Sequence, residues 1–175
     1  MDKQKVYWSL FDNGTWRFPV AATERGLCYA GIRGEGKEAV EKWAEKHFPG
    51  STLEQNAEYL ERYERELAEF FAGERSCFTL PVDLRGTPFQ MSVWGALAEI
   101  PYGHTVSYSD IAAAIGKPRA IRAAASAVGA NPVLAVIPCH RVIGKNGELT
   151  GFRGGMDMKQ ALLALEEGHS ASSAQ

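Results

Sequence analysis

The feature that most constrains the fold is a change of hydrophobic pattern along the chain. Near the start, Lys5–Phe11, Thr15–Ala21 and Gly26–Ile32 are rich in aromatic and β-branched residues and are separated by turn-forming residues. Such segments are typical of an antiparallel meander. Beyond them the apolar residues mostly recur at helical spacing. The sequence therefore predicts an α+β (or α/β) protein that begins with a small antiparallel sheet.

Two helices and a boundary are expected after this sheet. The ranges Lys37–Phe48 and Asn56–Ala72 have helical patterns, and both helices should cover the sheet. The segment Pro81–Gly86 then carries turn formers without a helical period. We therefore predict an N-terminal domain at 1–85, a C-terminal domain at 86–169 and a disordered polar tail at 170–175.

The C-terminal domain should be mostly helical. Its helices are predicted at Pro88–Glu99, from the N-cap Ser107 to Ile115, at Arg119–Val128 and at Met156–Glu166. The second and third are joined by Gly116-Lys117-Pro118, which outlines a helix-turn-helix of winged-helix-like type. The apolar run Val133–Ile137 predicts a buried strand, and Asn146-Gly147 predicts a tight hairpin.

Charge is distributed unevenly over the 175 residues. The net charge is −2 overall, but residues 1–85 carry 12 Lys and Arg against 15 Asp and Glu, whereas residues 101–160 carry 7 against 3. A face that binds nucleic acid should therefore lie in the second half. The helix Arg119–Val128 is almost all alanine apart from two arginines, which favours close approach to DNA. Alanine is also the best helix former, so a purely structural role stays open.

Cys139 is the candidate nucleophile. It follows Pro138 and precedes His140 and Arg141, and cationic neighbours lower the pKa of a thiol. Most cysteines are inert buried residues, and the tetrapeptide alone does not decide between the two roles. Glu166, at the edge of the last helix's apolar stripe, is a candidate to orient His140, with a solvent-exposed helix end as its alternative.

Cofactors, metals and membranes are not expected. Cys28, Cys77 and Cys139 have no CxxC spacing, which predicts free thiols and neither a disulfide framework nor a metal site. No apolar run approaches the roughly 20 residues of a spanning helix, and the first residues do not resemble a signal peptide. We expect a cytoplasmic, monomeric protein without a cofactor.

The string Pro138-Cys139-His140-Arg141-Val142, preceded by Asn131-Pro132, resembles the active-site signature of the O6-alkylguanine-DNA alkyltransferases. The similarity extends from Phe89 through Glu166, and residues 1–85 resemble the family's ribonuclease H-like domain in layout. The resemblance implies direct DNA repair, in which an alkyl group moves irreversibly from O6-alkylguanine in duplex DNA to Cys139. It leaves open whether O4-alkylthymine is also a substrate.

The resemblance also implies residue roles. Cys139 would be the acceptor, activated through a water by His140, which Glu166 holds, while Tyr108 assists the flipped base and Asn131 ties the recognition helix to the active-site loop. Arg122 would fill the gap in the base stack. Further DNA contacts would come from Ser107, Arg119, Ala123 and Ala130. The guanine pocket would be lined by Pro138, Val142, Phe152, Arg153 and Met156.

Two positions depart from the family's pattern, and three other functions compete. Ala124-Ala125-Ser126 stands where a glycine-containing stretch is frequent, and Phe152 stands where tyrosine is frequent. A non-catalytic alkyltransferase-like damage sensor would lack the cysteine that is present here. A redox-sensing transcriptional regulator would need a preferred operator, and a cysteine hydrolase would need a His in direct contact with sulfur.

Overall fold

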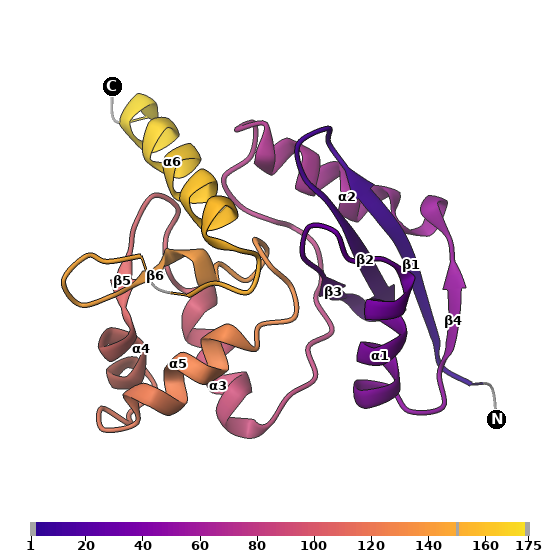
Figure 1. Ribbon diagram of the computed structural model, residues 1–175, viewed down its shortest axis with the longest axis horizontal. Coiled ribbons are helices and arrows are strands. Elements are labelled where there is room, and N and C mark those ends of the chain that lie inside the picture. The colour runs from indigo at the N-terminus through magenta and orange to yellow at the C-terminus, as the bar shows by residue number, and fades with distance from the viewer. Residues whose placement is uncertain (1–2, 150, 174–175) are drawn as a thin grey trace. The chain divides into compact units, whose positions relative to one another are not determined.

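The structure is a computed structural model that describes residues 3–149 and 151–173. The chain folds as two compact units, Met1–Arg85 and Gly86–Gln175. Figure 1 shows the first unit in indigo to magenta and the second in pink to yellow. Each unit has its own core and is described by itself. Among the described residues, no helix combines the length and apolarity needed to cross a membrane.

A four-stranded sheet with the order β3-β2-β1-β4 forms the base of the first unit. Its strands are β1 (Lys5–Asp12), β2 (Arg17–Thr23), β3 (Gly26–Ala30) and β4 (Thr52–Gln55). The first three form the predicted antiparallel meander, whereas β4 pairs with β1 in parallel. The sheet is therefore mixed. β4 escaped prediction because it is short and only Leu53 is partly buried, so it has no alternating pattern.

The two predicted helices, α1 (Lys37–His47) and α2 (Ala57–Phe71), cover opposite faces of this sheet. Alternate residues of β1 show the arrangement. Trp8 belongs to the cluster that contains Val40 of α1, whereas the neighbouring Tyr7 stacks on Tyr59 of α2 with ring centroids 4.0 Å apart. Both faces of the sheet are thus buried, as expected of a two-sided core.

The segment that follows α2 is fixed to the edge of the sheet at β3. Leu27 donates a backbone hydrogen bond to Pro81 (3.0 Å), and Asp83 donates one back to Leu27 (2.8 Å). Thr23 Oγ1 donates to the buried Asp83 carboxylate at 2.6 Å. Gly26 permits this approach, because its φ is +151° and a Cβ there would lie 2.5 Å from the Pro81 oxygen.

We expect Gly26→Ala to destabilise the first unit more than Gly14→Ala does. Both glycines have a positive φ, but nothing lies within 4 Å of a Cβ at Gly14. Gly14→Ala should therefore cost only conformational strain, about 1 kcal/mol. Gly26→Ala adds a backbone clash and should cost about 3 kcal/mol or more. Urea denaturation measures both, and equal losses would contradict the close fit at Pro81.

The second unit is mostly helical, as predicted. Its elements are α3 (Pro88–Ala98), β5 (Val106–Ser107), α4 (Tyr108–Ala114), α5 (Ile121–Gly129), the 3-10 turn η1 (Cys139–Arg141), β6 (Val142–Ile143) and α6 (Met156–Ser173). Thr87 with Gln90 and Ser107 with Asp110 form complete capping boxes, which satisfy backbone N–H groups at the starts of α3 and α4.

Helices α4 and α5 pack together as the predicted helix-turn-helix, and α3 packs against both. The indole of Trp94 on α3 donates to the carbonyl of Ala127 on α5 at 2.8 Å. α5 begins at Ile121, two residues later than the predicted Arg119. The reason is local, because the Ala120 N–H first closes a turn onto the Lys117 carbonyl (2.9 Å).

The segments on either side of Cys139 agree only in part with the sequence-based expectation. Val133–Ile137 is a buried turn, so the predicted strand is wrong; Ala135 has a φ of 70° and Ile137 donates to the Val133 carbonyl. Apolar runs of this length do not distinguish a strand from other buried structure. The predicted turn at Asn146-Gly147 is present, closed by a 2.7 Å bond from Gly144 N to Glu148 O.

The expected return strand after this turn is not seen in the described residues up to 149, and Thr150 lies outside them. β6 instead pairs in parallel with β5. α6 continues past Gly168 to Ser173, so the expected disordered tail, 170–175, is helical as far as it is described, and residues 174–175 lie outside. A single glycine costs a helix only about 1 kcal/mol, and no proline follows to end it.

Candidate active site

Cys139 begins the 3-10 turn η1 and is almost fully buried, with 3% of its surface exposed. The side chain of Asn131 organises its surroundings. Asn131 Nδ2 donates to Cys139 Sγ at 3.2 Å and to the Ile137 carbonyl at 2.8 Å, and Oδ1 accepts from Val133 N at 3.0 Å. One buried amide thus holds both ends of the turn that delivers the thiol.

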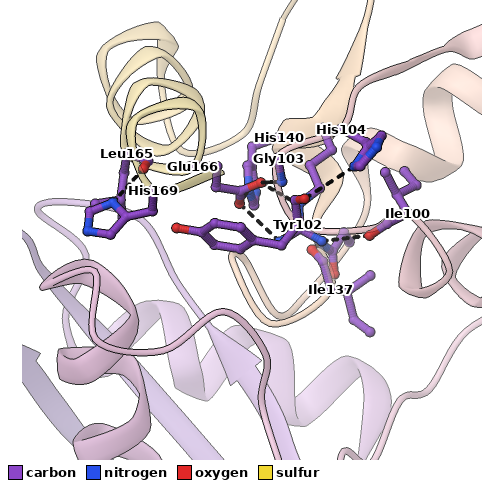
Figure 2. A network of polar contacts seen from close by, with 11 residues as sticks. Ile100, Tyr102, Gly103, His104, Ile137, His140, Leu165, Glu166 and His169 are labelled. Carbon is purple, nitrogen blue, oxygen red and sulfur yellow. Dashed lines mark hydrogen bonds and ion pairs between the residues drawn. The ribbon is translucent and has the colours of Figure 1, made fainter. Parts of the chain in front are cut away.

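A second set of bonds, shown in Figure 2, converges on the buried carboxylate of Glu166 from α6. His140 Nε2 lies 2.5 Å from Glu166 Oε2. Arg141 donates to both carboxylate oxygens, at 2.7 and 3.0 Å, and also to the Ile100 carbonyl at 2.7 Å. The backbone N–H of Gly103 donates to Oε1 at 3.1 Å. The two residues after Cys139 are therefore fixed by one acidic group.

The charges of this cluster follow from the balance of burial and pairing. Burial alone would raise the pKa of Glu166, but its bonds to His140 and Arg141 outweigh burial and lower the pKa to about 2. Burial lowers the pKa of His140, against the effect of Glu166. At neutral pH the carboxylate is therefore ionised and the imidazole is neutral. A neutral imidazole that donates Nε2–H to Glu166 carries its lone pair on Nδ1.

The groups that change the pKa of the Cys139 thiol are not those that the sequence suggested. Burial raises the pKa of Cys139, and the Asn131 hydrogen bond and the positive charges of Arg153 and Lys159 lower it. The sequence pointed instead to His140 and Arg141, its neighbours in the chain. That expectation is wrong in its detail, because Arg141 is paired with Glu166 and His140 is neutral.

The residues expected to line a guanine pocket lie next to η1 in the chain and in the segment that leads into α6. Pro138 and Val142 are buried on either side of η1, and Phe152 and Met156 are half-buried on the approach to α6 and at its first residue. Arg153 Nε donates to the Asn131 carbonyl at 3.1 Å. The loop before α6 is thereby tied to the residue that contacts the thiol.

The residues expected to contact DNA lie on the helix-turn-helix. Arg119 and Arg122 are exposed before and within α5, and Ala123 and Ala130 are exposed within it and at its C-cap. Tyr108 is the half-buried first residue of α4. Ser107 is its N-cap, and its hydroxyl accepts from Asp110 N at 3.1 Å. The structure connects this element to the thiol through Asn131, whose N–H donates to Val128 in the last turn of α5.

Nothing in the described part of the chain forms a metal centre, since no three His, Cys, Asp or Glu residues gather with suitable geometry. The three cysteines are free thiols.

Comparison with known proteins decides the family. Residues 88–168 match the model of the 6-O-methylguanine DNA methyltransferase DNA binding domain, and residues 6–84 match that of its ribonuclease-like domain. An inducible methylated-DNA–protein-cysteine methyltransferase of Bacillus subtilis is 52% identical over 95% of this chain and 93% of its own length. The chain belongs to the 6-O-methylguanine DNA methyltransferase family. The resemblance stated from the sequence is confirmed.

Solved structures of this methyltransferase family share the fold. The O6-methylguanine methyltransferase of Mycobacterium tuberculosis superposes with a TM-score of 0.81 at 36% identity, covering 94% of each chain. A structure of M. tuberculosis OGT in complex with DNA superposes with a TM-score of 0.78 at 36% identity, covering 93% of this chain and 94% of that one. The predicted fold, a ribonuclease-like unit followed by a helical DNA-binding unit, is confirmed.

Sequence reasoning missed two basic groups of the methyltransferase site. Arg141 was considered only as a neighbour of the thiol, whereas it anchors Glu166. Lys159 is fully buried and donates to the Val142 carbonyl at 2.6 Å. The spacing of Lys159, Leu162 and Glu166, which share one stripe of α6, could have indicated the role of Lys159. A lysine within an apolar stripe is rarely there for packing alone.

The lowered pKa of Glu166 predicts acid sensitivity. A carboxylate whose pKa is depressed on folding stabilises the protein above its ordinary pKa, 4.5, and loses that contribution as pH falls towards the folded value of about 2. The stability advantage of the wild type over Glu166→Gln should shrink by about 3 kcal/mol across this interval. Denaturant titrations at several pH values measure it.

The adjacent Glu167 provides the matched control, because it is exposed and undergoes the same substitution. Glu167→Gln should keep a constant stability difference from the wild type over the same interval. A Glu166→Gln difference that is equally flat would show that the carboxylate is not held by His140 and Arg141.

Proposed function

We propose that this chain repairs DNA directly, by accepting the alkyl group of O6-alkylguanine on Cys139 in a single irreversible transfer. The observation that carries the proposal is the buried Cys139–His140–Glu166 arrangement, with Asn131 bonded to the sulfur. The Bacillus subtilis relative named above is a methylated-DNA–protein-cysteine methyltransferase, and that name describes this transfer.

The charge state of the site suits removal of the thiol proton. A neutral His140 can take that proton, through one water, while the ionised Glu166 stabilises the imidazolium that forms. The Asn131 amide and the positive charges of Arg153 and Lys159 stabilise the thiolate. Burial, which opposes ionisation in the resting protein, strengthens these interactions once the site is dry.

The transfer itself exchanges one bond for another. The Cys139 thiolate attacks the alkyl carbon, a carbon–sulfur bond forms, and the bond from that carbon to O6 breaks with its electron pair on the guanine oxygen. The guanine then gains the proton that the thiol lost. The product is a thioether, which is a poor leaving group, so each molecule should react once.

Binding of duplex DNA is assigned to the helix-turn-helix. The exposed small residues Ala123, within α5, and Ala130, at its C-cap, would permit close approach to a minor groove, and the exposed Arg119 would contact a phosphate. Arg122 would occupy the gap left by the flipped nucleotide, and Tyr108 would stand beside the extruded base. An open depression lined by Lys117, Pro118, Arg119 and Ala120 adds positive charge at the turn.

This proposal assigns DNA binding and alkyl transfer to residues 86–169 and leaves 1–85 as the ribonuclease-like domain. The non-catalytic damage sensor is not favoured, because Cys139 is present and built into a polar network. A monomeric state and a cytoplasmic location stay predictions, which sedimentation and cell fractionation would test.

Replacing the acceptor should separate chemistry from binding. Cys139→Ala should gain no methyl group from a duplex that carries one O6-methylguanine, while its affinity for that duplex changes less than about threefold, since the sulfur is one buried atom outside the DNA-facing helix. Intact-protein and peptide mass spectrometry measure the transfer. The exposed Cys77→Ala is the matched control and should gain one methyl on Cys139. A methyl group gained by Cys139→Ala would refute the acceptor.

Arg122→Ala should separate base extrusion from chemistry. Because Arg122 is proposed to replace the flipped base in the stack, its loss should slow single-turnover repair of duplex by about tenfold or more. Reaction with free O6-benzylguanine, which needs no extrusion, should be almost unchanged. Arg119→Ala should instead lower the salt dependence of DNA binding by about one ion. Equal losses of Arg122→Ala on both substrates would remove the proposed role.

A further inference from the structure

The position of Lys159 is unfavourable in two respects, its burial and its place in the first turn of a helix. Its exposed fraction is 0%, and burying an ammonium group is strongly unfavourable unless it is compensated. It also lies in the first turn of α6, where its N–H donates to Gly155 O at 3.1 Å, and cations are disfavoured at the positive end of a helix. A buried cation at this position therefore calls for a compensating interaction.

The hydrogen bonds of Lys159 lead to the acceptor turn. Its Nζ donates to the Val142 carbonyl at 2.6 Å, and the Val142 N–H donates to the Cys139 carbonyl, closing η1. The ammonium group is thus linked through a single residue to the peptide of Cys139. Glu166, two turns further along α6, holds His140 and Arg141. One helix face therefore contacts η1 and its C-cap at two points, with a cation at the Val142 carbonyl and an anion at the side chains of His140 and Arg141.

Positive charge exceeds negative charge among the groups of η1 and this face of α6. Arg141 and Lys159 are positive, Glu166 is negative and His140 is neutral. Arg153, from the loop before α6, adds a further positive charge near Cys139. Because Arg141 is bonded to Glu166 through both carboxylate oxygens, the charges of these two groups largely offset each other. The positive charge of Lys159 acts on the thiol and favours the thiolate.

We propose that Lys159 is a positioning residue for the acceptor, whose buried ammonium group orients the Val142 wall of the pocket and supplies positive charge against which the Cys139 thiolate forms. This inference rests on the proposed role of Cys139. It adds a second device to the His140–Glu166 pair: that pair removes the proton, and Lys159 stabilises the anion left behind. The effect is mutual, since burial lowers the pKa of Lys159 and the negative charge of Cys139 raises it.

The first test titrates the thiol without any DNA. The ultraviolet thiolate absorbance of Cys139 is isolated by subtracting the titration of Cys139→Ser, in the wild type and in Lys159→Met, which keeps a similar length without the charge. We expect the pKa of Cys139 to be higher in Lys159→Met, with about tenfold less thiolate at a given pH below both values. Lys145→Met, at an exposed lysine, should leave the pKa unchanged. An unchanged pKa in Lys159→Met would overturn the proposal.

The second test needs no variant of Lys159 and so does not depend on how Lys159→Met folds. Nitrogen-15 NMR of the lysine side chains follows the titration of Lys159 in the wild type and in Cys139→Ser. Coupling between two sites is reciprocal, so the pKa of Lys159 should be lower where no thiolate can form. The same pKa in both proteins would mean that the two groups do not interact.

The third test connects the charge to the chemistry. The single-turnover rate with free O6-benzylguanine should fall about threefold to tenfold in Lys159→Met at neutral pH and approach that of the wild type as pH rises, since a thiolate of higher pKa is scarcer but more nucleophilic. A loss that is equal at all pH values would mean a merely structural role. If the wild type itself transfers nothing, the proposed function fails, and the two titrations still decide whether Lys159 and Cys139 are coupled.

Discussion

The second unit depends on a single buried carboxylate. Glu166 is 1% exposed, and an ionised carboxylate at such a depth is strongly unfavourable unless it is paired and hydrogen-bonded. Here it accepts from His140, from two nitrogens of Arg141 and from the backbone of Gly103. Three stretches of chain that are distant in sequence, the middle of α6, the turn η1 and the loop after α3, therefore meet at one group. None of them can shift without leaving a buried charge in an apolar environment.

The same constraint explains why so many polar groups are kept near a thiol that itself is buried. A thiolate in an apolar pocket is disfavoured by desolvation, and burial does raise the pKa of Cys139. The protein opposes this with an amide from Asn131 and with positive charge from Arg153 and Lys159. Because these groups are fixed by the fold, they need no reorganisation when the charge forms, which is the advantage of a preorganised site over water. The cost is a core crowded with ionisable residues.

The sequence predicted the elements whose structure is decided by local chemistry, and it failed where long-range pairing decides. The meander, the helix starts at Thr87 and Ser107 and the helix-turn-helix all follow from short patterns of turn formers, caps and apolar spacing. In contrast, β4 becomes a strand only because β1 offers an edge, and Val133–Ile137 becomes a turn because a neighbouring side chain satisfies its backbone. The partner of Arg141 lies 25 residues away, and proximity in the chain suggested the thiol instead.

Lys159 was overlooked for the same reason, since its bond to Val142 exists only when α6 is packed against η1. In each case a local pattern was compatible with more than one partner, and tertiary packing chose.

The coupling of the DNA-facing helix to the acceptor rests on Asn131. This residue is fully buried and lies just beyond the C-cap of α5, with its N–H bonded to Val128 of that helix and its side chain bonded to Cys139 Sγ. Its carbonyl accepts from Arg153 of the loop that precedes α6. Even a small displacement of α5 would lengthen the bond to sulfur, because densely packed interiors transmit strain. The helix that is proposed to meet the duplex and the thiol that is proposed to receive the alkyl group are therefore held in register by one side chain. This explains why an amide, with two N–H donors and an acceptor, suits the position better than any apolar residue of the same size.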